Sequence, residues 1–297
     1  MPELPEVQTI VDDLNRKIKG DIITDFWSDA PKNIKNISVE QFKKGVVGKK
    51  IIIAHRIGKN MFIDLSDGKT IYIHLKMTGH LLVKLQNTKD KYQKNSKNQK
   101  SKSKTDYFED KVNQYIHHIW YLGKNKNLEF SDLRKFAKIV LLDTKDIRNY
   151  KDITTLGVDA LSPDFTQAKF KEILARRPKA PVGIVLMDQN LIAGIGNIYR
   201  SEILYAAGVM PTRLAKDLTG SEIKEIYKQI GIILKKAIKL RGTSDSDYRD
   251  TDGAPGNFHK VLKVYRREKK TCQKCGTIVK RMKMGGRSVF YCEKCQK

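Results

Sequence analysis

Four cysteines near one end of the chain place the strongest constraint on how it folds. They are the only cysteines in the sequence, and they have the spacing C-x2-C-x16-C-x2-C at Cys272, Cys275, Cys292 and Cys295. This spacing is typical of a zinc ribbon, in which four thiolates bind one zinc ion as a tetrahedron. Since four thiolates leave no position for water, the sequence predicts one structural zinc ion. A pair of disulfides is the alternative, but we expect no signal peptide and hence no oxidising compartment.

The sequence is strongly basic. It has 58 Lys and Arg residues against 33 Asp and Glu, and a net charge of +25. The segment 260–297, which contains the cysteines, has 13 Lys and Arg against two Glu. An imbalance of this size predicts a polyanionic partner. Nucleic acid is favoured over a membrane as this partner. No apolar run approaches the roughly 20 residues that span a bilayer.

The first half of the chain predicts one helix followed by many short strands. Residues 7–18 repeat apolar side chains at helical spacing and end before Gly20. Stretches rich in β-branched and aromatic residues, separated by turns, then predict strands at 22–27, 50–57, 61–65, 70–76, 81–85, 116–122, 127–130 and 137–142. This pattern favours a β-sandwich or barrel. The Lys- and Asn-rich segment 86–105 interrupts this pattern, and we expect a disordered surface insertion. It is either a solvated loop with no specific role or a segment that contacts a phosphate backbone.

After about residue 145 the pattern becomes helical. Helices are predicted at 165–177, 184–208 and 220–241, the last with a capping box formed by Thr219 and Glu222. A glycine-rich turn at 193–196 suits an anion, although such a turn is weak evidence by itself. The turn-rich segment 242–258 predicts a binding loop or lid. We therefore expect an α+β chain with a β-sandwich domain (1–150), a helical domain (151–258) and a zinc ribbon (259–297).

The N-terminal Pro2-Glu3 pair suggests covalent chemistry. If Met1 is removed, Pro2 presents a secondary amine whose pKa near 8 leaves part of it unprotonated at neutral pH. Such an amine attacks an electrophilic carbon and yields a cationic iminium, for which Glu3 could move protons. The alternative is structural, because Pro and Glu are also common at the start of an ordinary helix.

Three independent motifs resemble the formamidopyrimidine-DNA glycosylase family. They are Pro-Glu-Leu-Pro-Glu-Val at 2–7, Gly-Ile-Gly-Asn-Ile-Tyr-Arg-Ser-Glu at 194–202, and the four-cysteine ribbon, in the family's order and over nearly the whole chain. The resemblance implies a bifunctional DNA glycosylase and AP lyase that removes oxidised purines such as 8-oxoguanine and formamidopyrimidines and then nicks the strand. It also implies damaged double-stranded DNA as the partner and a monomeric, cytoplasmic protein associated with the nucleoid.

The resemblance assigns the catalytic roles. Pro2 corresponds to the nucleophile that attacks C1′ of the damaged nucleotide, and Glu3 corresponds to the proton donor. Glu6 corresponds to an acidic residue that supports them. Lys59 corresponds to the lysine of β-elimination and phosphate contact, and Arg287 to the ribbon-tip arginine of δ-elimination.

The resemblance also implies DNA contacts. Met77, Arg134 and Phe136 correspond to side chains that fill the gap left by an extruded base. Asn197 and Tyr199 belong to the helix–two-turn–helix motif that binds phosphate, and His117, His118 and Lys179 are further candidates, the two histidines without a fixed register. Segment 242–258 corresponds to the lesion-capping loop, with residues 246–249 as its candidate base contacts.

Three positions depart from the family pattern, and two alternatives remain. Leu133 and Lys135 replace Pro and Arg, and Gly183 replaces a lysine. The loss of that lysine affects what the resemblance implies about lesion preference and about one DNA contact. The endonuclease VIII-like branch, which acts on oxidised pyrimidines, is one alternative, and Leu4 argues against it because that branch has Gly there. The other is a non-catalytic DNA-binding protein, against which the intact Pro2-Glu3 pair argues.

Overall fold

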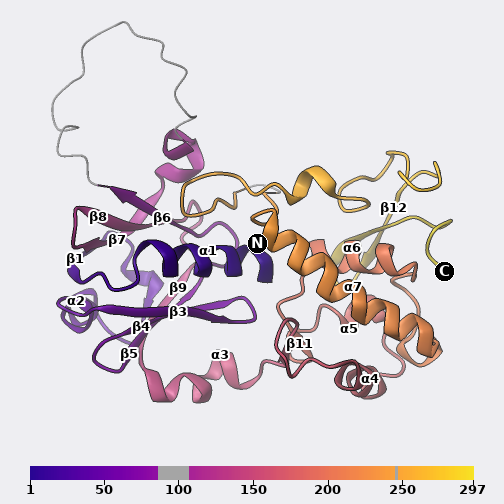
Figure 1. Ribbon diagram of the computed structural model, residues 1–297, viewed down its shortest axis with the longest axis horizontal. Helices are drawn as coiled ribbons and strands as arrows, with labels where there is room; N and C mark the ends of the chain where they lie inside the picture. Colours follow the sequence, from indigo (N-terminus) through magenta and orange to yellow (C-terminus); the bar gives the residue numbers. More distant parts are fainter. Residues whose placement is uncertain (86–106, 245–246) are drawn as a thin grey trace, which may run out of the picture.

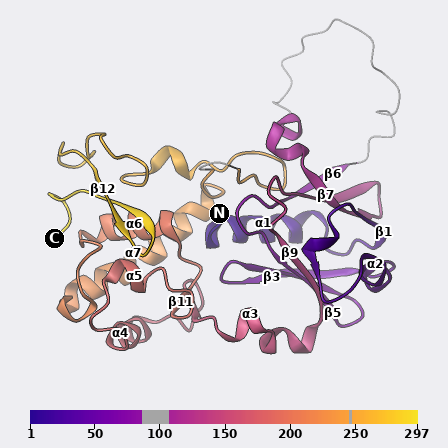
Figure 2. The same ribbon diagram turned by 180° about the vertical axis from the view of Figure 1, so that it is seen from behind.

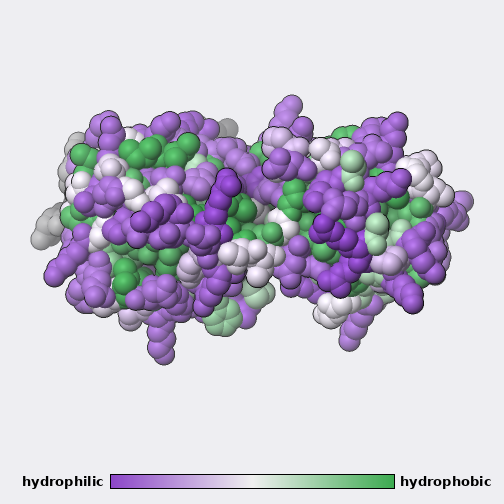
Figure 3. Space-filling view, turned by 90° about the horizontal axis from the view of Figure 1, so that it is seen from below, coloured by the Kyte–Doolittle hydropathy of each residue, from purple (hydrophilic) through white to green (hydrophobic). Residues whose placement is uncertain are grey.

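The computed structural model describes residues 1–85, 107–244 and 247–297 and forms two lobes side by side (Figure 1). The predicted insertion at 86–105 and Ser246 lie outside the described residues. Viewed from below, most of the surface of both lobes is hydrophilic, with small separate apolar areas (Figure 3). Within the described ranges, no helix combines the length and apolar composition needed to cross a membrane.

The first lobe is a β-sandwich, as the sequence predicted. Its four-stranded sheet has the order β1-β7-β8-β6, with β1 (Ile23–Ser28), β7 (Ile116–Leu122), β8 (Lys126–Ser131) and β6 (His80–Leu85). Its five-stranded sheet has the order β2-β9-β5-β4-β3, with β2 (Ile34–Lys35), β9 (Lys138–Asp143), β5 (Lys69–His74), β4 (Asn60–Leu65) and β3 (Ile51–Ile57). Phe26, Trp120 and Phe130 of the first sheet share one buried core with Ile63 and Ile71 of the second.

Helix α1 (Leu4–Lys17) anchors the N-terminus against this sandwich. Val7, Ile10, Val11 and Leu14 are buried in the same core as both sheets. Its first turn is fixed by a capping box between Glu3 and Glu6. Figure 1 shows that α1 runs to the junction of the lobes, where the N-terminus lies beside α7. Because one face is buried along its length, the chain end is held in place. The shorter helix α2 (Val39–Val46) packs beside β1.

The second lobe is mainly helical. It contains α3 (Lys151–Thr154), α4 (Gln167–Ala175), α5 (Val182–Val185), α6 (Asn197–Ala207) and α7 (Gly220–Lys239), with a two-stranded parallel pair β10 (Val158–Asp159) and β11 (Ile192–Ala193). The prediction of one helix over 184–208 is wrong. Gly194 has a φ of +110°, which a helix does not allow, and the chain turns before α6 begins at Asn197.

The zinc ribbon ends the chain as a hairpin of β12 (Lys280–Met284) and β13 (Arg287–Tyr291). Gly285 and Gly286 have φ values of +57° and +73°, which fits a two-residue turn with positive φ at both positions. Strand β13 packs against α6, and Figure 2 shows the hairpin beside that helix. The hairpin tip therefore lies near the N-terminal end of α6, since Asn197 contacts Ser288 there.

Candidate active site and DNA-binding surface

The Glu3 carboxylate lies on the N-terminus of α6. It accepts hydrogen bonds from the backbone N–H groups of Gly196 at 2.7 Å, Ile198 at 2.9 Å and Tyr199 at 3.4 Å. Glu3 is only 3% exposed, and Pro2 beside it is also buried. A helix N-terminus stabilises an anion through its unpaired N–H groups and its dipole. The first turn of the chain is thus held against the glycine-rich turn of the second lobe.

Glu6 is buried one turn further along α1. Its carboxylate accepts hydrogen bonds from the Glu3 N–H at 2.7 Å, the Tyr199 hydroxyl at 2.5 Å and the Thr243 N–H at 2.7 Å. Burial, followed by the nearby Glu3 charge, raises the pKa of Glu6 to about 7, although the three hydrogen bonds oppose this rise. Glu6 is therefore a buried carboxyl group that changes its charge near neutral pH.

Lys59 reaches the same place from the turn between β3 and β4. Its ammonium donates to the Ile195 carbonyl at 2.9 Å, and only 7% of the residue is exposed. Burial lowers the pKa of Lys59, and the Glu3 charge opposes that effect. The structure thus brings Pro2, Glu3, Glu6 and Lys59 together around the turn that precedes α6.

Sequence reasoning missed two residues that hold the turn before α6 and the turn that carries Lys59. The Asp159 carboxylate accepts the Gly58 N–H at 2.7 Å, next to Lys59. Gln189 donates to the Ile195 carbonyl at 2.7 Å and accepts from the Gly194 N–H at 3.0 Å. Asp159 ends the short strand β10 and Gln189 lies in a loop, and only their long-range contacts give these two polar residues a role.

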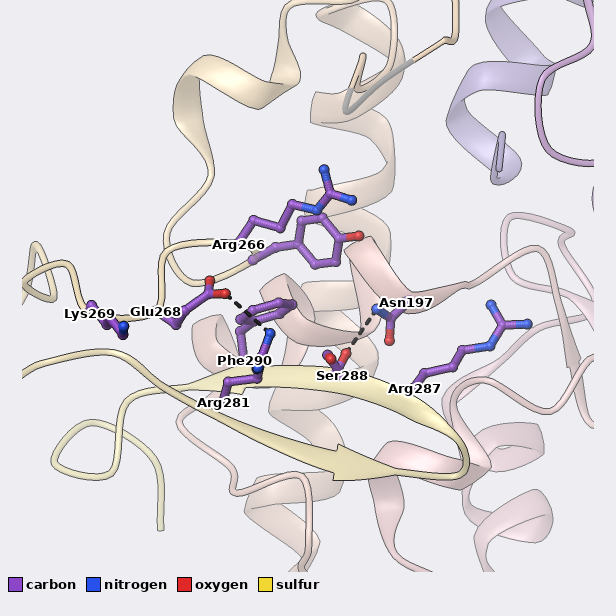
Figure 4. Close-up of a pocket in the computed structure, with 9 residues that line it drawn as sticks. Asn197, Arg266, Glu268, Lys269, Arg281, Arg287, Ser288 and Phe290 are labelled. Carbon is purple, nitrogen blue, oxygen red and sulfur yellow. Dashed lines mark hydrogen bonds and ion pairs between the residues drawn. The ribbon is translucent and has the colours of Figure 1, made fainter. Parts of the chain in front are cut away.

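A basic groove lies between the start of α6 and the ribbon. It has a volume of about 760 Å³ and is lined by Asn197, Tyr265, Arg266, Glu268, Lys269, Arg281, Arg287, Ser288 and Phe290 (Figure 4). The Asn197 amide donates to the Ser288 carbonyl at 2.9 Å, and buried Arg200 donates to the Asn197 side-chain oxygen. Arg287 is exposed at the hairpin tip. The groove places several cations along one path, as a phosphate backbone requires.

Met77, Arg134 and Phe136 form an exposed cluster, as their predicted role requires. Met77 is 45% exposed and Phe136 is 54% exposed. The Arg134 guanidinium lies 4.6 Å from the Phe136 ring centre, and its Nη1 is 3.0 Å from the Met77 sulfur. Buried Asp132 supports the turn by accepting the Ala137 N–H at 3.0 Å.

Three residues that were predicted to contact DNA are buried in the structure. Tyr199 is fully buried and donates to Glu6, so it positions that carboxylate and does not reach DNA. His118 is also fully buried, in the sandwich core beside Phe26 and Trp120. His117 is 7% exposed and contacts Asp29. Lys179 is exposed before α5 and remains a prediction.

The four cysteines fit one zinc ion. All four lie in the described part of the chain, none is in a disulfide, and their sulfur atoms lie within 4.8 Å of one another. The Cys272–Cys295 and Cys275–Cys292 sulfur distances are 3.8 and 3.4 Å. Ligands about 2.3 Å from a tetrahedral zinc ion are about 3.8 Å apart, whereas a disulfide requires about 2.05 Å. The predicted structural zinc site is confirmed.

Family models match almost the whole chain. The N-terminal domain of formamidopyrimidine-DNA glycosylase matches residues 1–139, its H2TH domain matches residues 156–248, and the zinc finger found in FPG and IleRS matches residues 269–297. The formamidopyrimidine-DNA glycosylases of Pelotomaculum thermopropionicum and Carboxydothermus hydrogenoformans are each 38% identical to this chain. The alignments cover 100% of this chain and 99% and 100% of those proteins.

Solved structures agree with these sequence matches. Lactococcus lactis Fpg in complex with DNA containing an abasic site has a TM-score of 0.83 and 28% identity, over 99% of each chain. The same enzyme with DNA containing FAPY-dG has a TM-score of 0.81 and 28% identity, over 99% of this chain and 100% of that one.

The fold, the zinc finger and the basic groove define a DNA-binding glycosylase of DNA repair. More particularly, the chain belongs to the formamidopyrimidine-DNA glycosylase family.

Proposed function

We propose that this protein is a bifunctional DNA glycosylase and AP lyase that excises oxidised purines from double-stranded DNA. The observation that carries the proposal is the convergence of Pro2, Glu3, Glu6 and Lys59 at the N-terminus of α6. Removal of Met1 would give Pro2 a secondary amine next to two carboxylates and a lysine of lowered pKa, an arrangement that suits covalent catalysis with proton transfer.

The first steps use Pro2 after removal of Met1. The Pro2 nitrogen attacks C1′, the glycosidic C–N bond breaks, and its electron pair leaves with the base, which gains a proton. The C1′–O4′ bond then opens, with its electron pair on O4′, to leave an iminium between C1′ and Pro2. Glu3, which lies next to Pro2, supplies and accepts the protons of these steps.

Strand cleavage follows from the iminium. Loss of the C2′ proton forms a C2′–C3′ double bond, and the 3′-phosphate leaves with the C3′–O electron pair. A second elimination expels the 5′-phosphate. Lys59 assists the first elimination and Arg287, at the hairpin tip, the second. Met77, Arg134 and Phe136 fill the gap in the duplex while the nucleotide is outside the stack.

The proposal for oxidised purines is supported by family membership and by the FAPY-dG complex of the Lactococcus lactis enzyme. We further propose that the protein acts as a monomer in the cytoplasm, at the nucleoid. Its proposed domains are the catalytic sandwich (1–150), the helical domain with the loop 242–258 (151–258), and the ribbon (259–297). Asn197 and Lys179 are proposed to contact phosphates from the helical domain.

Borohydride trapping tests the function. The protein is mixed with a duplex containing 8-oxoguanine opposite cytosine, and borohydride is added to reduce any iminium to a stable amine. We expect an adduct whose peptide mass places the DNA on Pro2, and no adduct from a form that retains Met1. Lys59→Gln should lower trapping and cleavage, whereas Lys69→Gln, at an exposed ion pair with Asp143, should not.

The other outcomes favour the alternatives. An oxidised-pyrimidine complex has been solved for Lactococcus lactis Fpg, so a pyrimidine lesion belongs in the same assay. An adduct with that lesion and none with 8-oxoguanine would move the protein to the endonuclease VIII-like specificity. Tight binding without an adduct on any lesion or abasic site would favour a non-catalytic DNA-binding protein.

A further inference from the structure

Arg241 joins the two lobes next to the active site. It lies just after α7, and its guanidinium contacts two carboxylates, with Nη2 2.5 Å from Asp13 of α1 and Nε 2.6 Å from Asp250 of the loop 242–258. The side chains of both aspartates are almost fully buried, 1% and 3% exposed. None of the roles described above uses this three-residue cluster.

The backbone at Arg241 is in an unusual conformation. Arg241 has a φ of +62° and Gly242 a φ of +80°, so two consecutive residues lie in the left-handed region. This conformation costs free energy for a residue with a side chain, and it persists only where the surroundings hold it. Backbone hydrogen bonds from the Arg241 N–H to the Ile238 carbonyl and from the Gly242 N–H to the Ala237 carbonyl, both 2.8 Å, close the turn. The two ion pairs of the Arg241 side chain add to that support.

The tight turn has a direct consequence for Glu6. The next residue after the turn, Thr243, points its N–H at the Glu6 carboxylate over 2.7 Å. The fit is close, because a Cβ on Gly242 would lie 2.8 Å from the Glu6 Oε1. A small rotation of the Arg241–Gly242 turn would therefore break the contact with Glu6 or press on it.

Asp13 and Glu6 lie on the same face of α1. They are seven residues apart, which is two helical turns. One end of this face contacts Thr243 through Glu6, and the other contacts Arg241 and Thr251 through Asp13, with the Thr251 hydroxyl donating at 2.8 Å. Two points of attachment fix both the distance and the rotation between α1 and the residues 241–243 and 250–251.

Two of the charges in the cluster, those of Asp13 and Arg241, are stable near neutral pH. Burial pushes the pKa of Asp13 up, but hydrogen bonds from Arg241 and Thr251 outweigh it and hold the pKa below its ordinary value. The pKa of Arg241 is raised, since its two carboxylate partners outweigh the effect of burial. Asp13 is ionised and Arg241 is protonated under the conditions in which Glu6 titrates.

We propose that Arg241 is a positioning residue for the reaction: by binding Asp13 and Asp250 together, it fixes the Thr243 N–H on Glu6 and holds the catalytic end of α1 against α6. The inference rests on the proposed function for its kinetic consequence. Its structural consequence, the position of Thr243, is independent of any activity.

Amide hydrogen exchange and trapping together test the inference. In Arg241→Gln, which removes the charge, the Thr243 N–H should lose its protection, and the trapping rate with an abasic-site duplex should fall about 10- to 100-fold. The dissociation constant for a duplex with a tetrahydrofuran abasic analogue should stay within about twofold. Arg241→Lys, which keeps one charged donor, should restore part of the rate and of the protection.

Two variants make the test selective. Lys69→Gln removes an equivalent charge from an exposed ion pair with Asp143, and it should leave exchange at Thr243 and the trapping rate unchanged. Asp250→Asn removes one of the two Arg241 contacts, so it gives a milder change if Arg241→Gln does not fold.

Each remaining outcome has one meaning. Unchanged Thr243 exchange in both Arg241→Gln and Asp250→Asn would overturn the inference, as would lost protection with an unchanged trapping rate. Equal losses of binding and trapping, with no recovery in Arg241→Lys, would reduce Arg241 to a purely structural residue. If the unmodified protein gives no trapped adduct, the proposed function fails, while Thr243 exchange still reports on the position.

Discussion

Gly196 and Glu3 are in such close contact that a side chain at position 196 would displace the Glu3 carboxylate. Gly196 donates its N–H to the Glu3 carboxylate at 2.7 Å, and an added Cβ would lie 2.3 Å from the carboxyl carbon of the same side chain. The backbone at Gly196 is extended, with a φ of −131°, so its conformation alone does not require glycine. The requirement arises from the carboxylate, which occupies the space a side chain would need.

Gly196→Ala should therefore displace Glu3 and inactivate the enzyme without unfolding it. We expect base excision to fall at least 100-fold, which is about the cost of a 1 Å misplacement of a catalytic group. Gly220→Ala is the matched control, since a Cβ there meets nothing within 4 Å. Single-turnover excision and a melting curve measure the two effects. A wild-type rate in Gly196→Ala would show that Glu3 need not lie on the end of α6.

Glu6 should make the stability of the fold depend on pH between about 4.5 and 7. Its pKa is raised from 4.5 to about 7, so folding favours the protonated form. This contribution to the unfolding free energy is fully present below pH 4.5 and is lost as the pH rises through 7. The loss is about 3 kcal/mol, because a pKa shift of one unit corresponds to roughly 1.4 kcal/mol. Urea unfolding at pH 5 and pH 8 measures it.

Two glutamine variants isolate this effect. Glu6→Gln cannot ionise, so its unfolding free energy should fall less between pH 5 and pH 8 than that of the unmodified protein. Glu40→Gln makes the same change at a fully exposed carboxylate whose pKa is lowered, and it should follow the unmodified protein over that range. If the Glu6→Gln protein shows the full pH dependence, another group is responsible.

The sequence predicted elements that depend on local patterns and failed where distant contacts decide. Cysteine spacing predicted the zinc site, and stretches rich in β-branched and aromatic residues, separated by turns, predicted the strands of the sandwich. His117 and His118 are adjacent on β7, at an irregularity in its pairing with β8, and the sequence does not say which of them faces the core. Burial of His118 between two aromatic side chains settles that side.

Tyr199 is a second instructive failure. It follows Asn197 by two residues on α6, and residues at that spacing point in different directions around a helix. Asn197 faces the ribbon, whereas Tyr199 faces Glu6. The motif alone does not separate these two roles, because the partners of both residues are far away in the sequence.

Phe136 should contribute to extrusion of the base and little to stability. It is 54% exposed, so Phe136→Ala should change the unfolding free energy by less than about 0.5 kcal/mol. Base excision from a duplex should fall about tenfold or more, because extrusion costs a few kcal/mol that the inserted ring offsets. Cleavage at an abasic site in a single strand, where no stack must be opened, should stay unchanged.

The control for this variant is Ile232→Ala, at an apolar side chain of α7 that is 45% exposed. It removes a similar apolar surface from the other lobe and should leave both reactions unchanged. An equal loss of duplex excision and single-strand cleavage in Phe136→Ala would contradict a role in filling the gap, since only the duplex reaction requires one.

Removal of zinc should unfold the ribbon and leave the sandwich folded. An isolated two-stranded hairpin is at best marginally stable, so β12 and β13 depend on the metal and on packing against α6. The sandwich has its own core, to which the cysteines do not contribute, whereas Cys272 and Cys292 belong to the core of the second lobe. Chelation should therefore abolish amide protection in β12 and β13 and preserve it in β4 and β5. It should also weaken DNA binding, because the Arg287 side of the basic groove is lost.

Re-addition of zinc should restore both amide protection and DNA binding. Protected β12 and β13 amides after complete removal of the metal would show that packing on α6 alone folds the ribbon.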